Sequence, residues 1–213
     1  MLGMIFEQFS RIGVVPVIIL DDSKDAAPLA EILCGNGIPC AEIAFRTPAA
    51  EETIRIMTRE FPDMLVGAGT ILTTEQADQA MNAGAKFIVS PGLNPKVVQY
   101  CIDSFIPVIP GVQTASEIEQ AIELGLKVVR FFPAEQAGGL ATIKALASEY
   151  IDIRFMPKGG ISAKNLKDYL AYDKVIACGG TWAAKRKLTA SGEWERIKSL
   201  VKEAASIVRN IRK

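Results

Sequence analysis

KVVRFFPAE, residues 127–135, has the pattern of a short buried strand that ends in a cation, two aromatic residues and a proline. Two valines precede Arg130, and β-branched residues of this kind are typical of strands covered on both faces. Such a strand carries Arg130 to the end of a sheet. A charge that is withdrawn from water needs a counter-charge or a function, so Arg130 marks a candidate site.

Buried-type strands recur on both sides of this segment, and each is followed by a helical pattern. The predicted strands are Val14–Leu20, Cys40–Arg46, Met64–Gly69, Ala85–Ser90, Ile106–Ile109, the opening stretch at residues 127–135, Ile153–Pro157 and Lys174–Cys178. The predicted helices end at Leu33, cover Ala49–Glu60, Thr74–Asn82, Asn94–Ser104 and Ala115–Leu124, lie within Gly139–Glu149, and cover Ser162–Ala171 and a C-terminal stretch from Gly192 or Glu193 towards Asn210. Caps such as Thr73 or Thr74, Asn94 and Thr114 open three of them.

Strands that alternate with helices predict parallel β-α-β units. The sequence therefore predicts an α/β protein with a single (β/α)8 TIM barrel over residues 1–213, preceded by an extra N-terminal helix at Phe6–Ile12. No linker or change of composition divides the chain. An open, doubly wound sheet is the alternative. In a barrel, the functional residues lie at the C-terminal ends of the strands.

Composition excludes several functions. The 213 residues include 24 basic and 24 acidic side chains, so net charge gives no reason to expect nucleic acid or an anionic membrane as a partner. There is no histidine, and no acidic cluster has the spacing of a metal site, so we expect neither metal nor cofactor. The four cysteines are scattered and no secretory signal is present, which predicts reduced thiols in a cytoplasmic protein without a membrane span.

The second strand carries a carboxylate and a cation near its end. Alternation puts Glu42 and Arg46 on the same side of this strand, which would point both into the barrel. One interpretation is a structural ion pair. The other is a proton-transferring carboxylate beside a cation that binds a substrate carboxylate.

Glycine pairs follow the seventh and eighth strands. Gly159 and Gly160 follow Lys158 at the start of one loop, and Gly179 and Gly180 precede Thr181 in the next. Loops at these strands of a barrel can bind phosphate through backbone N–H groups and a helix N-terminus, and Thr181 adds a hydroxyl. Plain turns are the alternative. The third and fourth strands end at Gly67-Ala68-Gly69-Thr70 and Ser90-Pro91-Gly92, which are weaker signals.

Arg130 and Lys158 end adjacent strands. A lysine that is desolvated beside another cation can be a neutral nucleophile that forms a Schiff base with a ketone, whereas arginine stays protonated. Other lysines, including Lys144 and Lys164, fall in helices or outer loops and are expected to be solvated.

Seven segments of the chain resemble the 2-keto-3-deoxy-6-phosphogluconate / 4-hydroxy-2-oxoglutarate aldolase family, in order and at the family's spacing. They are AEIAFRT (41–47), GAGT (67–70), FIVSP (87–91), PGVQT (110–114), FFPAE (131–135), PKGGI (157–161) and GGTW (179–182). The resemblance implies a homotrimeric barrel lyase that cleaves a 2-keto-3-deoxy-6-phospho sugar acid to pyruvate and glyceraldehyde 3-phosphate without a metal.

By the same resemblance, Glu42 transfers protons and Phe132 lines the pocket. Arg46, Thr70 and Pro91 would surround the carboxylate derived from pyruvate. The phosphate would be held by Gly159, Gly160, Gly180 and Thr181.

The chain departs from the family at the centre of the motif. The family's Schiff-base lysine stands directly before Phe-Phe-Pro-Ala-Glu, where this chain has Arg130, and a threonine is usual where it has Lys158. Neighbouring strands lie about 5 Å apart, so we hypothesise that the nucleophile has moved to Lys158 and that Arg130 lowers its pKa. The alternatives are a member that binds keto acids or phosphate without covalent chemistry, and an oxaloacetate-type decarboxylase.

Overall fold

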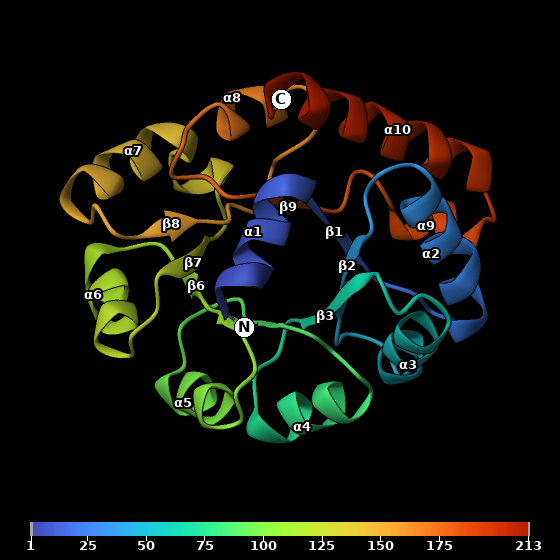
Figure 1. The fold of residues 1–213 in the computed structure, drawn as a ribbon, viewed down its shortest axis with the longest axis horizontal. Helices are drawn as coiled ribbons and strands as arrows, with labels where there is room; N and C mark the ends of the chain where they lie inside the picture. The colour runs from blue at the N-terminus through green and yellow to red at the C-terminus, as the bar shows by residue number, and fades with distance from the viewer. Residues whose placement is uncertain (1, 213) are drawn as a thin grey trace.

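The computed structural model describes residues 2–212 and forms a ring of parallel strands surrounded by helices (Figure 1). The strands are β1 (Val14–Ile18), β2 (Cys40–Ala44), β3 (Leu65–Gly69), β4 (Ile88–Val89), β5 (Val108–Ile109), β6 (Gly111–Val112), β7 (Val128–Phe131), β8 (Arg154–Phe155) and β9 (Cys178–Gly180). The helices are α1 (Leu2–Ile12), α2 (Ala26–Gly35), α3 (Ala50–Glu60), α4 (Thr74–Asn82), α5 (Pro95–Asp103), α6 (Ala115–Glu123), α7 (Gly139–Glu149), α8 (Leu166–Leu170), α9 (Arg186–Ala190) and α10 (Trp194–Ile211), with 3-10 turns at Ser23–Asp25 and Glu135–Ala137.

The strands close into a barrel, as the sequence predicted. One sheet runs in the order β5-β4-β3-β2-β1-β9 and the other in the order β6-β7-β8. Two parallel bridges, Phe155 to Val175 and Lys158 to Gly179, join the ends of these sheets. The open, doubly wound alternative is therefore wrong.

The fifth strand of the barrel begins and ends later in the chain than predicted, and it is divided in two. Its first half pairs with β4 and its second half with β7, where Gly111 aligns with Arg130. Pro110 lies between the halves, and its carbonyl accepts a hydrogen bond from Arg130 N at 2.8 Å. Proline has no N–H group for a continuous ladder, so the strand changes neighbours at this residue.

Three of the helices begin at predicted capping residues, but some helices differ in length from those that the sequence predicted. Thr73, Asn94 and Thr114 each accept a backbone N–H at the start of a helix. The predicted helix Ser162–Ala171 is shorter, because Ser162 N donates to Asn165 Oδ1 and holds the first residues in a turn. The short helix α9 was not predicted.

Helix α1 covers the N-terminal ends of the strands, which we call the floor of the barrel; their C-terminal ends form the mouth. In Figure 1 this helix crosses the centre of the ring. Ile5 and Phe9 are buried among residues from most of the strands, and the Phe9 ring meets Phe87 edge-on at 4.9 Å. At the same end, Arg212 donates hydrogen bonds to the carbonyls of Ser10, Val175 and Ile176.

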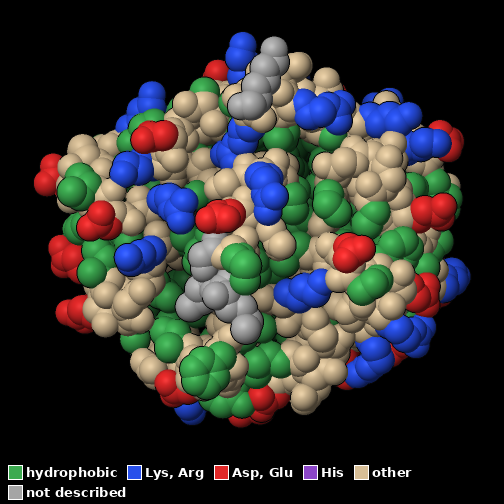
Figure 2. Space-filling view, viewed as in Figure 1, with side chains coloured by type: hydrophobic (Ala, Val, Ile, Leu, Met, Phe, Trp, Pro, Cys, Tyr) green, Lys and Arg blue, Asp and Glu red, His purple; other side chains and the backbone are tan. Residues whose placement is uncertain are grey.

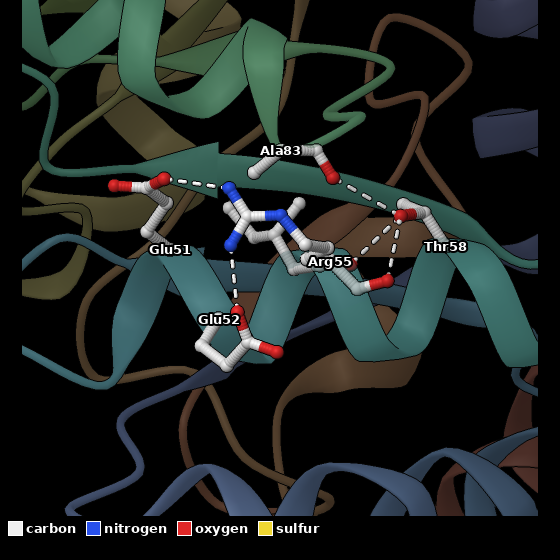
Figure 3. Close-up of polar contacts among 6 residues, drawn as sticks. Glu51, Glu52, Arg55, Thr58 and Ala83 are labelled. Atoms are coloured by element: carbon white, nitrogen blue, oxygen red, sulfur yellow. Dashed lines mark hydrogen bonds and ion pairs between the residues drawn. The ribbon is translucent and has the colours of Figure 1, made fainter.

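Polar contacts run along helix α3 and connect it to the end of α4. On α3, Arg55 pairs with Glu51 and Glu52, and Thr58 donates to the Ala83 carbonyl at 3.1 Å beyond the end of α4 (Figure 3). On the face that carries α1, basic and acidic side chains are interspersed (Figure 2). No helix among residues 2–212 combines the length and the apolar character that crossing a membrane requires.

Candidate active site

A buried ion pair occupies the barrel interior below the mouth. Arg130 of β7 donates from Nη1 to Glu42 Oε1 at 3.0 Å and from Nη2 to Glu42 Oε2, although the two residues are 88 positions apart. Arg130 is 2% exposed and Glu42 is 0% exposed. The bidentate geometry fixes the orientation of the carboxylate and lets both charges remain in the interior.

Two glycines leave room for this pair. A Cβ atom at Gly69 would lie 2.1 Å from Glu42 Oε1, and one at Gly179 would lie 3.3 Å from Arg130 Nη2. An alanine at Gly69 would therefore displace the carboxylate. The sequence predicted a close backbone approach at the end of the third strand, and it is the Glu42 carboxylate that lies against the backbone there.

Arg46 does not accompany Glu42 into the interior, which corrects the prediction. Its side chain is exposed and forms no ion pair with any residue of 2–212. Strand β2 ends at Ala44, and Arg46 N donates back to the Ala44 carbonyl at 2.8 Å, so the chain turns before the alternation reaches position 46. The partner of Glu42 is Arg130 instead.

Lys158 lies beside this pair at the mouth. Its side chain is half-buried, and Nζ lies 4.9 Å from the centre of the Phe132 ring. A Cβ at Gly179 would come within 3.2 Å of the Lys158 stem as well as close to Arg130. Lys158 and Arg130 therefore share the space over Gly179.

The surroundings lower the pKa of Lys158. Burial is the largest cause, the positive charge of Arg130 is the second, and Arg46 adds to the same effect, whereas Glu42 opposes it. Lys158 forms no salt bridge within residues 2–212. It is thus an amine near a buried cation with a reduced tendency to hold its own proton.

The backbone around Lys158 is tied to the strand β7 segment. Lys158 N donates to the Phe131 carbonyl at 3.0 Å, and Ala134 N donates to the Lys158 carbonyl at 2.8 Å. Positive φ values at Gly159 and Gly160, of 108° and 77°, turn the chain away from the mouth. Only glycine adopts the first of these readily, which accounts for the glycine pair.

The predicted phosphate residues border one side of the mouth. The N–H groups of Gly160 and Thr181 donate no hydrogen bond to other residues of 2–212. Gly180 is covered by the Trp182 ring, since a Cβ there would meet that ring. Helices α8 and α9 begin only at Leu166 and Arg186, so loop amides, rather than the predicted helix N-terminus, line this side.

Thr70 and Pro91 follow adjacent strands on the opposite side of the ring. Thr70 has a positive φ of 59°, a strained conformation for a β-branched residue. Pro91 approaches the next strand so closely that a Cβ at Gly111 would lie 2.0 Å from the Pro91 carbonyl oxygen. No group of three or more acidic or cysteine side chains within residues 2–212 has the geometry to hold a metal ion.

Sequence reasoning missed two residues next to this site. Tyr169 of α8 donates a hydrogen bond to Glu135, and Glu135 lies against Gly160. Glu135 belongs to the opening motif, which was the available signal. No sequence signal pointed to Tyr169, because its partner Glu135 lies 34 positions away in the chain.

The chain matches known proteins over nearly its whole length. The model of the family described as KDPG and KHG aldolase matches residues 5–200. A 2-dehydro-3-deoxy-phosphogluconate aldolase of Treponema pallidum is 48% identical over 96% of this chain and 97% of its own. One from Haemophilus influenzae is 46% identical over the same shares of the two chains.

Solved structures agree with the sequence matches. A KDPG aldolase from Legionella pneumophila, with pyruvate captured as a covalent carbinolamine intermediate, is 36% identical with a TM-score of 0.89, over 92% of this chain and 95% of that chain. The enzyme of Zymomonas mobilis ZM4 with 3-phosphoglycerate is 37% identical with a TM-score of 0.86, over 95% of both chains. This chain therefore belongs to the KDPG and KHG aldolase family.

Proposed function

We propose that this protein is a class I aldolase in which Lys158 is the Schiff-base nucleophile. Its substrate is a 2-keto-3-deoxy-6-phospho sugar acid, and its products are pyruvate and glyceraldehyde 3-phosphate. The single observation that carries the proposal is the position of Lys158, a half-buried amine with a lowered pKa beside the Arg130–Glu42 pair. The family relationship supports the reaction class.

The amine attacks the C2 carbonyl of the substrate, and the carbinolamine loses water to give an iminium ion. Removal of the C4 hydroxyl proton then breaks the C3–C4 bond, releases the aldehyde and leaves an enamine. Protonation of the enamine at C3 and addition of water return the free amine and pyruvate. Only a neutral amine begins this sequence, so the lowered pKa of Lys158 favours it.

Glu42 is the proton-transferring group in this proposal, and Arg130 positions it. An ionised carboxylate has about four acceptor positions, and a bidentate arginine uses two of them. Glu42 can therefore accept a substrate proton while it remains paired. Arg130 takes the position of the family's lysine but acts on Glu42 and Lys158 instead of on the substrate.

In this proposal the carboxylate and the phosphate of the substrate bind on opposite sides of the mouth. Arg46, Thr70 and Pro91 bind the carboxylate, and Arg46 offers a long, exposed cationic side chain whose charge acts on Lys158. Phe132 packs against the reacting carbon atoms and against Lys158. The phosphate is bound by Gly159, Gly160, Gly180 and Thr181.

A second candidate function is ligand binding without covalent chemistry. It is favoured by Arg130 itself, because a guanidinium group stands where the family has its reactive amine and is fully enclosed with Glu42. In that case Lys158 is an anion ligand. The two candidates differ in whether the ε-amino group must be neutral and nucleophilic.

Trapping with borohydride separates them. The protein is incubated with pyruvate and sodium borohydride, digested and analysed by mass spectrometry. We expect the Lys158 peptide to gain a reduced pyruvyl group, and Lys158→Arg to abolish the label while keeping the positive charge. Retro-aldol turnover should fall about a thousandfold or more in this variant.

Lys164→Arg is the matched control, since Lys164 is an exposed lysine near the same loop. It should be labelled and active like the wild type. Wild-type protein that carries no pyruvyl label at Lys158, or Lys158→Arg protein that keeps full turnover, rejects the nucleophile and leaves the binding function.

We also propose a homotrimer in a reducing, cytoplasmic compartment. The family resemblance supports the trimer, and sedimentation at several concentrations tests it. The four cysteines are all free thiols, three of them buried, which supports the compartment.

A further inference from the structure

Glu135, the last residue of the opening motif, has no part in the proposed chemistry but is held by a buried phenol. Tyr169 is 2% exposed, and its hydroxyl donates to Glu135 Oε1. Burial and, after it, the contact with Glu135 raise the pKa of Tyr169, so the phenol keeps its proton and acts as the donor. The contact joins α8 to the turn that follows β7.

Glu135 lies directly on the glycine pair that follows Lys158. Its backbone N–H donates to the Gly159 carbonyl at 3.1 Å. A Cβ atom at Gly160 would lie 2.5 Å from Glu135 Cγ and 2.6 Å from its Cβ. The stem of Glu135 therefore fills the space above Gly160.

The carboxylate of Glu135 turns away from that loop. A Cβ at Gly139 would lie 3.0 Å from both Glu135 Oε1 and the Tyr169 hydroxyl oxygen. From a Cβ atom at Gly160, the nearest atom beyond the Glu135 stem is Gln136 Nε2, at 3.9 Å, and not a carboxylate oxygen of Glu135. The negative charge is thus directed towards α7 and α8, and the Tyr169 hydroxyl holds it there.

We infer that Tyr169 is a specificity-determining positioning residue, which holds the charge of Glu135 away from the Gly159–Gly160 loop and so lets this loop accept a phosphate group. The inference rests on the phosphate placement in the proposed function. A released Glu135 side chain could rotate about its stem towards the loop. Its charge would then repel a phosphate dianion at short range.

The test compares two ligands and two substitutions by calorimetric binding. Tyr169→Phe removes the hydroxyl and keeps the ring in the core. We expect it to weaken 3-phosphoglycerate binding about five- to tenfold, the effect of one unit charge acting over several ångströms in partly solvated surroundings. Pyruvate, which has no phosphate, should bind unchanged. Adding Glu135→Gln to Tyr169→Phe should restore 3-phosphoglycerate binding to within about twofold, because the released side chain is then neutral.

Tyr172→Phe is the matched control, because Tyr172 follows the same helix and its ring contacts Lys144 instead of Glu135. It should bind both ligands as the wild type does. The inference is overturned if Tyr169→Phe leaves 3-phosphoglycerate binding unchanged, weakens both ligands equally, or is not rescued by Glu135→Gln. Wild-type protein that binds pyruvate but not 3-phosphoglycerate overturns the phosphate placement as well.

Discussion

The floor and the mouth of the barrel each hold an arginine, half-buried Arg212 and buried Arg130, and the two arginines have different kinds of partner. Arg212 at the floor donates to main-chain carbonyls, which are neutral and fixed by the fold. Arg130 near the mouth donates to a carboxylate, so two charges are buried together. The cation at the floor joins chain segments, whereas the charges near the mouth lie beside Lys158, an amine with no salt-bridge partner among residues 2–212.

The largest effect on stability should come from breaking the pair near the mouth. Arg130→Met leaves the Glu42 carboxylate buried without a counter-charge, and we expect the free energy of unfolding to fall by about 3–5 kcal/mol. Denaturant unfolding measures it. Arg186→Met is the control, since its pair with Asp21 is exposed and screened by water, so its loss should change the free energy of unfolding very little. Equal losses in both variants would contradict the distinction between buried and exposed pairs.

A smaller loss is expected at the floor. Arg212→Met removes the donor to three carbonyls, which are neutral acceptors, and should cost about 1.5–3 kcal/mol in unfolding free energy. Pyruvate trapping at Lys158 should continue at the wild-type rate at low temperature. Arg209→Met, an exposed change in the last turn of α10 shortly before Arg212, serves as the control. A variant that folds normally but loses trapping would show that the two ends are coupled.

The smallest effect concerns the pH dependence of Lys158. Arg46 lowers the pKa of Lys158, so Arg46→Met should raise it and reduce the neutral fraction of the amine at neutral pH. The acid limb of the trapping rate, measured at saturating pyruvate, should therefore move to higher pH by a small amount. Arg59→Met, on the outer helix α3, should leave the profile in place. A shift to lower pH would contradict the proposed electrostatics.

The sequence predicts the barrel well because its signals are local. A strand covered on both faces needs a continuous apolar run such as Val14–Leu20, and a helix start needs a capping side chain such as Thr114. The division of the fifth strand at Pro110 is not local. It depends on the register of two different neighbours, which a single segment does not contain.

The candidate site is predictable as a set of residues but not as a set of contacts. Strand-end positions bring Glu42, Arg130 and Lys158 together, as expected for a barrel. Alternation along β2 could not show that the chain turns before Arg46, nor that Glu42 is paired across the barrel with β7. Such partners depend on the stagger of the strands, and Tyr169 was missed for the same reason.

Helix α1 has a consequence for the movement of small molecules. Because Ile5 and Phe9 seal the floor, a compound that reaches Lys158 comes in and departs through the mouth. Under the proposed reaction, the aldehyde and pyruvate therefore leave along the route by which the next substrate arrives. Helix α1, which supplies no reactive group, thus closes the opposite end of the barrel, so that accumulated product competes with incoming substrate at the mouth.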